Sequence, residues 1–310
     1  MKSAALIIDV SRKINAFDYI SKIKPLMDNM DHYDVVYCLL NDLAVNDANY
    51  LIYDKKSLIK DNVQTLINLG LDKKVEYVLQ SKIEGLFELS NELSKYIYIS
   101  KIIKNDFLKT SIQKNSLNDI KLSTLINVAN IFSSIILLNV NDLYETRNFE
   151  SLSELVKKVL FNYNEANDNK LFWPNIMINQ DIYCNNLSAD GNSFISEKFD
   201  NDISLDLVGE ELQAKINGIF TDPNHIRVQD KGTVEGNPLF AFVDAICSDA
   251  DVKEFFGLAS IEKLKDNYRE GGIGDFKIKK MLYSAFLKKF ECCSSKINAD
   301  EIYSRLNVKI

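Results

Sequence analysis

The sequence is short of the residues on which many metal-binding and catalytic sites depend. It contains only two histidines, His32 and His225, and five cysteines without a Cys-x-x-Cys spacing. These numbers leave few ligands for a structural zinc ion and few bases for histidine-dependent catalysis, so we predict no metal site. The odd cysteine count, with Cys292 and Cys293 adjacent, is typical of reduced thiols in a cytoplasmic protein.

Long apolar runs and excess positive charge are also missing. No run approaches the roughly 20 apolar residues that a membrane-spanning helix needs, and the N-terminus does not resemble a secretory signal peptide. We therefore expect a cytoplasmic protein without a membrane partner. The net charge of −7 gives no overall attraction for nucleic acid. DNA is not an expected partner, and RNA would need a local basic face.

Glycine and proline are scarce and unevenly distributed. Six of the 11 glycines and two of the 4 prolines fall between residues 220 and 282. In a chain with so few, each one is expected to mark a backbone position with a special requirement. Five of these glycines and both prolines belong to three segments, which are residues 221–227, 232–240 and 268–275.

Hydrophobic periodicity predicts an α/β fold. Segments 4–9, 34–40 and 75–79 have the apolar character of buried strands, and segments 12–30 and 57–69 have helical periodicity. Strands that alternate with helices of this length indicate a doubly wound parallel sheet. Further helices are expected over segments 82–105, 123–138 and 276–290. A capping box at residues 151–154 is expected to start another helix. A second, helical region is expected to begin near residue 205.

These three segments resemble, in the same order, the C-terminal helical region of tryptophanyl-tRNA synthetases. Less specific matches in the right order extend the resemblance through most of the chain. They are Lys24-Pro25 with Tyr33-Asp34, Asp42-Leu43, Val78–Ser81, Ile136–Leu143 and Asp190–Asn192. The resemblance implies a Rossmann-like nucleotide-binding domain at residues 1–204 and a helical, anticodon-binding-type domain at 205–310. It also implies ATP with Mg²⁺, a tRNA partner and a homodimer.

Both ATP signatures of the family depart from its pattern. The HIGH-type motif should lie at residues 15–18, which read Asn-Ala-Phe-Asp. No glycine precedes Gly70, so the close approach of backbone to nucleotide that glycine permits is lost. Asn15 and Asp18 are either remnants of a rewired nucleotide site or residues that cap the helix starting there.

The KMSKS-type segment and the amino-acid pocket are altered as well. Phe194 and Glu197 stand at the two lysine positions, while Ser196 persists and Lys198 falls on the final serine position. Ser196 and Lys198 could hold a phosphate or lie in a solvated loop. Ile135 occupies the position of the aspartate that meets the indole N–H in the family, and an apolar group there would leave that donor unpaired.

A local basic region accompanies the third segment. Residues 263–289 contain eight basic and three acidic side chains. Lys277, Lys279 and Lys280 form a possible RNA face, with a solvated helix face as the other interpretation.

The sequence therefore favours a degenerate synthetase paralogue, a pseudoenzyme that binds a tRNA, a nucleotide or a protein partner. The alternative is a repurposed enzyme that activates another amino acid or uses an aminoacyl-tRNA or adenylate made elsewhere. In that case the Cys38 thiol or the Ser11 hydroxyl could serve as a nucleophile. An ordinary tryptophan–tRNA ligase is the third interpretation.

Overall fold

The computed structural model describes residues 1–43, 55–105, 122–147, 149–178 and 202–294. Within these ranges the chain forms two compact units. The first unit contains residues 1–14 and 21–178, and the second contains residues 15–20 and 202–294. Among the described residues, no helix has the length and apolar character that a bilayer crossing requires.

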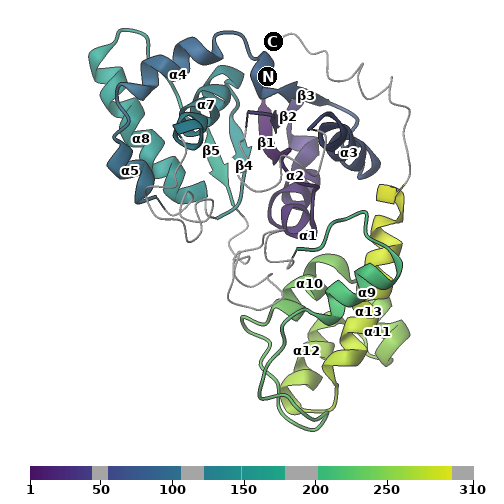
Figure 1. Cartoon of the computed structure of the whole chain (residues 1–310). Helices are drawn as coiled ribbons and strands as arrows, with labels where there is room; N and C mark the ends of the chain where they lie inside the picture. The colour runs from purple at the N-terminus through teal and green to yellow at the C-terminus, as the bar shows by residue number, and fades with distance from the viewer. Residues whose placement is uncertain (44–54, 106–121, 148, 179–201, 295–310) are drawn as a thin grey trace. The chain divides into compact units, whose positions relative to one another are not determined.

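A parallel sheet of five strands lies at the centre of the first unit (Figure 1), with the strand order β3-β2-β1-β4-β5. The strands are β1 (Ser3–Asp9), β2 (Val35–Asn41), β3 (Val75–Leu79), β4 (Asp142–Tyr144) and β5 (Asn175–Met177). β1 pairs with β2 along its whole length and with β4 from Ala4 to Leu6. Because the strand order reverses at β1, the sheet is doubly wound, as the sequence predicted.

Helices cover both faces of the sheet (Figure 1). On one face lie η1, a π-helical turn (Tyr19–Ile23), α2 (Lys24–Asn29), the short η2 (Met30–His32) and α3 (Lys55–Asn68). The connection from β3 to β4 crosses to the other face through η3 (Gln80–Lys82), α4 (Leu86–Ser94), α5 (Ile99–Ile103) and α7 (Leu122–Leu138). On that face α8 (Phe149–Ala166) connects β4 to β5.

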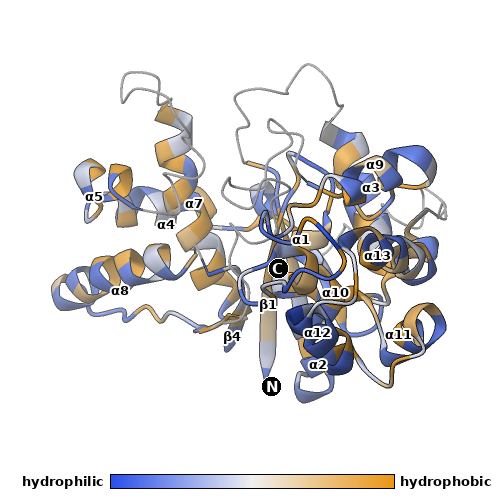
Figure 2. Ribbon diagram, turned by 90° about the horizontal axis from the view of Figure 1, so that it is seen from below, coloured by the Kyte–Doolittle hydropathy of each residue, from blue (hydrophilic) through white to orange (hydrophobic). Residues whose placement is uncertain are grey.

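An extended apolar cluster of the first unit lies between the sheet and α7. Figure 2 shows α7 as a mostly hydrophobic helix, whereas α8 has a hydrophobic stripe and a hydrophilic one. This difference follows from their positions, since α7 packs against α4 and lies within the cluster while α8 keeps one face in solvent. The strand residues of the cluster come from alternate positions and include Ala5, Ile7, Leu39, Val78 and Leu143. These positions define the α7 face of the sheet.

The second unit is helical. Its elements are α1 (Ala16–Asp18), α9 (Gly209–Asn217), α10 (Pro238–Ile246), α11 (Asp249–Phe256), α12 (Ile261–Glu270), α13 (Asp275–Phe290) and η7 (Glu291–Ser294). α13 packs against α9, α10 and α11, with Met281 and Phe286 fully buried. Two glycines are required by close packing. A Cβ atom on Gly232 would lie 2.1 Å from Tyr268 Cε1, and one on Gly271, where φ is +82°, would lie 2.4 Å from the Gln229 carbonyl oxygen.

Most elements expected from periodicity are confirmed, and several details were wrong. The segment 12–30 becomes helical only at Ala16 and contains a π-helical turn, and the segment 82–105 forms two helices. Ser151 does not cap α8, because that helix begins at Phe149. The Ser151 hydroxyl instead donates to Asn105 Oδ1 at 3.0 Å. The short strands β4 and β5 were not predicted.

Candidate functional site

The carboxyl edge of the sheet carries polar side chains from four neighbouring strands, which we call the strand-edge row: Asp9, Asn41, Gln80 and Glu145. Asp9 pairs with Asn41 in the register of β1 and β2, and Gln80 follows the pair Leu40 and Leu79. Each member comes two residues after an apolar residue of the α7 face. Because side chains alternate along a strand, all four are expected on that face. Parallel sheets of this kind bind ligands at this edge, where the strand order reverses.

A buried ion pair lies at the point of reversal. The pairing of β1 with β4 ends at Leu6 and Tyr144. Lys22 Nζ, from the π-helical turn, donates to the next carbonyl oxygen of β1, that of Ile7, at 2.6 Å and lies 3.3 Å from Glu145 Oε1. The side chains of Lys22 and Glu145 are 7% and 5% exposed. A protein amine therefore already occupies part of the crevice in which such sheets hold their ligands.

Side chains also fix the loops that follow the strands. After β2, Asp42 accepts hydrogen bonds from the backbone N–H of Ser81 at 2.8 Å and from its hydroxyl. After β1, Asn62 of α3 accepts from the Ile14 N–H at 3.0 Å and donates to the Arg12 carbonyl oxygen at 2.9 Å. The edge of the sheet is thus preorganised by hydrogen bonds between its loops.

The N-terminus of α1, in the second unit, is closed by its own side chains. Asn15 Oδ1 accepts from the Asp18 N–H at 3.0 Å, and Asp18 Oδ2 accepts from the Asn15 N–H at 3.2 Å, which is a complete capping box. The Ala16 N–H donates to the Ile203 carbonyl oxygen at 2.7 Å. Asn15 and Asp18 are 1% and 4% exposed. The N–H groups of Asn15, Ala16 and Asp18 are therefore occupied, and a carboxylate that would repel a phosphate lies beside them.

The other residues predicted from the ATP and amino-acid signatures are not brought to this edge by any described contact. Ser196 and Lys198 lie outside the described residues. Ile135 is 1% exposed and belongs to the apolar cluster between α7 and the sheet. No group of three or more histidine, cysteine, aspartate or glutamate side chains among the described residues could hold a metal ion.

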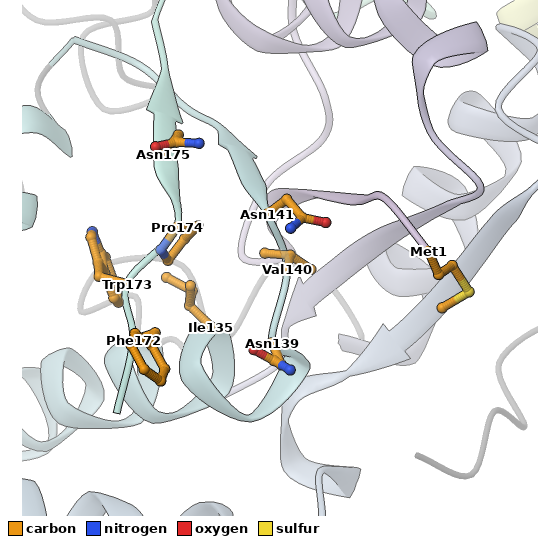
Figure 3. Close-up of a pocket in the computed structure, with 9 residues that line it drawn as sticks. All are labelled: Met1, Ile135, Asn139, Val140, Asn141, Phe172, Trp173, Pro174 and Asn175. Atoms are coloured by element: carbon orange, nitrogen blue, oxygen red, sulfur yellow. The ribbon is translucent and has the colours of Figure 1, made fainter. Parts of the chain in front are cut away.

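A pocket of about 330 Å³ lies at the opposite, amino end of the strands. Figure 3 shows Asn139, Val140 and Asn141 on the segment that enters β4, and Phe172 to Asn175 on the segment that enters β5. Ile135 lines one side of this pocket. Several polar groups here already serve the fold, since Trp173 Nε1 donates to Ser153 Oγ at 2.9 Å and Asn141 Oδ1 accepts from the Ser3 N–H at 2.8 Å.

The motifs at residues 221–227 and 232–240 contribute hydrogen bonds to the internal framework of the second unit. Asp222 accepts from the Asn224 and Thr233 N–H groups at 2.8 and 2.9 Å, and the bond from Asn224 is the main reason that the pKa of Asp222 is lowered. Asn237 caps α10 by accepting from the Leu239 N–H. These contacts stabilise turns and cap a helix, so the motifs have a structural role in this unit.

His225 belongs to the same framework. Its ring lies 4.4 Å from that of Tyr268, whose hydroxyl donates to Asp275 Oδ1 at 2.8 Å. His225 Nδ1 comes within 3.3 Å of the same oxygen but without the alignment of a hydrogen bond. Burial is the main reason that the pKa of Tyr268 is raised well above its usual value. The group packs as a unit and carries no free nucleophile or metal ligand set.

The three lysines of the predicted RNA face have different environments. Lys279 Nζ donates to the carbonyl oxygens of Asn217 and Ile219 at 2.7 and 2.6 Å, so it caps the C-terminal end of α9, and burial lowers its pKa. Lys277 and Lys280 are exposed on α13, where their amines lie over the rings of Phe256 and Phe276.

Cys38 has no environment for nucleophilic catalysis. It lies within β2 at 0% exposure, and burial raises the pKa of its thiol to about 12. A thiolate is the reactive form, and almost none would be present near neutral pH. The alternative nucleophile Ser11 follows β1, where its N–H donates to Asp9 Oδ1 at 2.9 Å.

The sequence interpretation missed Lys22, Glu145 and the two carboxamides of the strand-edge row. One signal for Lys22 was available, since it follows Ile20 and precedes Ile23 in an apolar helical pattern. A charge at such a position needs a partner. Nothing in the sequence indicates that the partner is Glu145.

Comparisons with known proteins agree with this architecture. No protein-family model matches the sequence. Its curated relatives include the tryptophan–tRNA ligase of Streptococcus mutans, 27% identical over 286 residues that cover 87% of this chain and 79% of the relative. The enzyme of the same name from Clostridium longisporum is 28% identical over 276 residues, which cover 87% and 78%. The chain is thus homologous to tryptophan–tRNA ligases at modest identity.

Solved structures share the fold. Tryptophanyl-tRNA synthetase from Mycoplasma pneumoniae superposes with a TM-score of 0.74 at 19% identity, covering 99% of this chain and 91% of that one. The Campylobacter jejuni enzyme, complexed with ADP and tryptophan, gives 0.69 at 16% identity and covers 97% and 88%. Tyrosyl-tRNA synthetase from Archaeoglobus fulgidus gives 0.67 at 16% identity and covers 94% and 88%.

The buried ion pair leads to a test by a double-mutant cycle. Lys22→Met and Glu145→Gln should each lower the free energy of unfolding by about 3–5 kcal/mol, because each leaves one buried group without its partner. The double variant should lose clearly less than the two single losses added together. Urea unfolding measures all four proteins. Additive losses would show that the two side chains do not interact.

The exposed pair Lys95 and Glu92, 2.6 Å apart, provides the matched control. Lys95→Met should change the free energy of unfolding by less than about 1 kcal/mol, because water already solvates both charges.

Proposed function

We propose that this homologue of tryptophan–tRNA ligases acts by binding RNA and does not activate tryptophan in the ordinary way. The closed N-terminus of α1 is the observation that carries the proposal. A nucleotide phosphate at that position would have to displace the capping box of Asn15 and Asp18 and lie against a buried carboxylate. Coulomb repulsion and the loss of two hydrogen bonds both oppose such binding.

The sequence departures support the same proposal. Phe194 and Glu197 stand where the resemblance places two lysines that meet developing phosphate charge. Ile135, at the expected indole-binding position, lies in the apolar core. We propose no catalytic residue, and ATP with Mg²⁺ is implied only by the resemblance. Residues 1–204 and 205–310 are proposed as a nucleotide-binding-type domain and an anticodon-binding-type domain.

The RNA partner is proposed from the family name of the relatives and from the surface of α13. Lys277 and Lys280 are one helical turn apart and exposed, so both amines can reach a phosphate backbone. Lys279 is left out of this face, because its amine already binds two carbonyl oxygens. A tRNA is the RNA that the names of the relatives suggest.

The strand-edge row favours a second candidate function, that of a repurposed enzyme. Asp9, Asn41, Gln80 and Glu145 present oxygen acceptors at the edge where parallel sheets bind ligands. Such a site could hold an amino compound other than tryptophan. Activation of that compound would require a nucleotide site elsewhere than the closed terminus of α1.

We also propose a homodimer formed through the first unit. Large apolar side chains are exposed on three helices of one sheet face, α4, α5 and α7, and exposed apolar patches mark interaction surfaces. They are Phe87, Ile99, Leu122 and Ile126, with exposed fractions of 58%, 58%, 69% and 49%.

Amino-acid-dependent exchange of pyrophosphate with ATP tests the main proposal. At high protein concentration, none of the twenty amino acids should support exchange above the background without protein, because the phosphate position is occupied by protein groups. An active tryptophan–tRNA ligase in parallel checks the assay. Exchange with tryptophan would contradict the proposal, and exchange with another amino acid would establish the repurposed enzyme.

Filter binding of tRNA at several salt concentrations tests the RNA face. The double variant Lys277→Ala/Lys280→Ala should bind more weakly than the unmodified protein, and its slope of log affinity against log salt should be shallower by about 2. The control Lys263→Ala/Lys288→Ala removes the same charge from lysines that are paired with acidic groups. Equal effects of the two double variants would reject the proposed face.

Light scattering tests the dimer. The protein should have the mass of two chains at micromolar concentration, and Ile126→Asp should convert it to a monomer because it places a charge in the apolar patch. Ile226→Asp, at an 84% exposed position of the second unit, is the matched control and should leave the mass unchanged. A monomeric unmodified protein would contradict the dimer.

A further inference from the structure

Buried oxygen atoms without hydrogen-bond partners are concentrated in the first unit. Among the described residues of this unit they are Asn41 Oδ1, Gln80 Oε1, Asn127 Oδ1, Asn130 Oδ1 and Ser133 Oγ. Buried polar groups in folded proteins are nearly always hydrogen-bonded, because a lone acceptor loses its bonds to water without replacement. Unpaired acceptors of this kind are suited to a bound donor group.

The first two of these acceptors lie side by side at the carboxyl edge of the sheet. Asn41 is the last residue of β2, and Gln80 follows β3 directly after the pair Leu40 and Leu79. They are 6% and 0% exposed. The neighbour of Asn41 on its other side is Asp9 of β1. Adjacent strands are about 4.8 Å apart, which a small ligand can span.

α7 brings further acceptors against Gln80. Asn127, Asn130 and Ser134 lie at spacings of three and four residues, so they share one side of this mostly apolar helix. Gln80 Nε2 donates to Ser134 Oγ at 3.0 Å, and Ser134 Oγ donates to the Asn130 carbonyl oxygen at 2.7 Å. These bonds fix the Gln80 side chain, use its donor and leave its oxygen unpaired.

We propose that Asn41, Gln80 and Asn130, together with the Asp9 carboxylate, form an acceptor cluster that binds a small cationic amine or guanidine. The unpaired oxygens require N–H donors, and the carboxylate favours a positive charge over a neutral amide. An anion would meet only acceptors at these atoms. Glu145 is not counted, because it is already paired with Lys22.

The acceptor cluster rests on the proposed function, because it names the ligand class for the sheet edge of a protein that we do not expect to bind ATP in the ordinary way. It uses only contacts within the first unit, whereas the closed terminus of α1 belongs to the second. The two ideas can therefore fail independently. Pyrophosphate exchange decides the first, and ligand-dependent stability without any nucleotide decides the second.

Thermal unfolding with three probes that carry the same butyl chain tests the acceptor cluster. Butylguanidine and butylamine carry a cationic donor group, and butylurea is the neutral counterpart of butylguanidine. The melting temperature should rise with the concentration of at least one cationic probe and stay constant with butylurea. No rise with either cation, or an equal rise with butylurea, would overturn the proposal and leave ordered water as the partner of the acceptors. A response to one cation alone identifies the head group.

Variants of the cluster separate binding from folding. Asn130→Leu should melt at the same temperature as the unmodified protein or higher without a probe, because an apolar group of similar size replaces an unpaired acceptor. The same variant should lose the response to the cationic probe. Asn41→Leu should behave alike and serves if Asn130→Leu does not fold.

Asn91→Leu is the matched control, since it changes an exposed carboxamide of α4. It should keep the full response to the cationic probe. If both cluster variants keep that response too, the probe binds elsewhere and the assignment is wrong.

Discussion

The ion pair between Lys22 and Glu145 lies where β4 stops pairing with the central strand. β1 is bonded on both sides only as far as Leu6, and the lysine amine satisfies the next carbonyl oxygen in place of a strand. This arrangement joins the π-helical turn after β1 to the end of β4 at the point where the strand order reverses. A buried amine needs a carboxylate beside it, and Glu145 provides one at the cost of desolvating both groups.

The described side chains at the N-terminus of α1 and at the carboxyl edge of the sheet are mainly oxygen acceptors, which are unfavourable for an anion. The first helix after β1 has its terminal N–H groups bonded by Asn15, Asp18 and the Ile203 carbonyl. The sheet edge presents carboxylate and carboxamide oxygens. The chain shares its sheet and helices with solved tryptophanyl-tRNA synthetases, and apolar packing supplies the stability of these elements.

The sequence was sufficient for the parts of the fold that have a long periodic signal. The three strands of five residues or more and the helices α3, α7 and α13 were predicted within about two residues. β4 and β5 are three residues long and give no period to detect. Ser151 satisfied the capping-box pattern, but Asn105, distant in sequence, bonds its hydroxyl instead. Asn15 and Asp18 were correctly offered as a helix cap, since that contact is local.

The candidate site was harder to predict because its contacts are not local. Lys22 and Glu145 are 123 residues apart in the sequence, and Gln80 and Ser134 are 54 residues apart. Only the strand register shows that Asp9, Asn41 and Gln80 are neighbours. For Ile135 and Cys38, the sequence did not reveal how deeply the side chains are buried. Residue type alone does not distinguish an isoleucine in a pocket wall, or a reactive cysteine, from the same residue in the core.

The backbone bond from Ala16 to Ile203 makes the helical unit discontinuous along the chain. Closing this loop requires most of the polypeptide to exist first, so the segment 15–20 must wait for its partner during synthesis, while β1 and β2 can already pair. Folding of the two units is therefore interleaved rather than sequential, and their long-range closure raises the contact order of the whole chain. A fragment that starts near residue 202 would lack one piece of its own unit, and a peptide carrying residues 15–20 would be the piece that completes it.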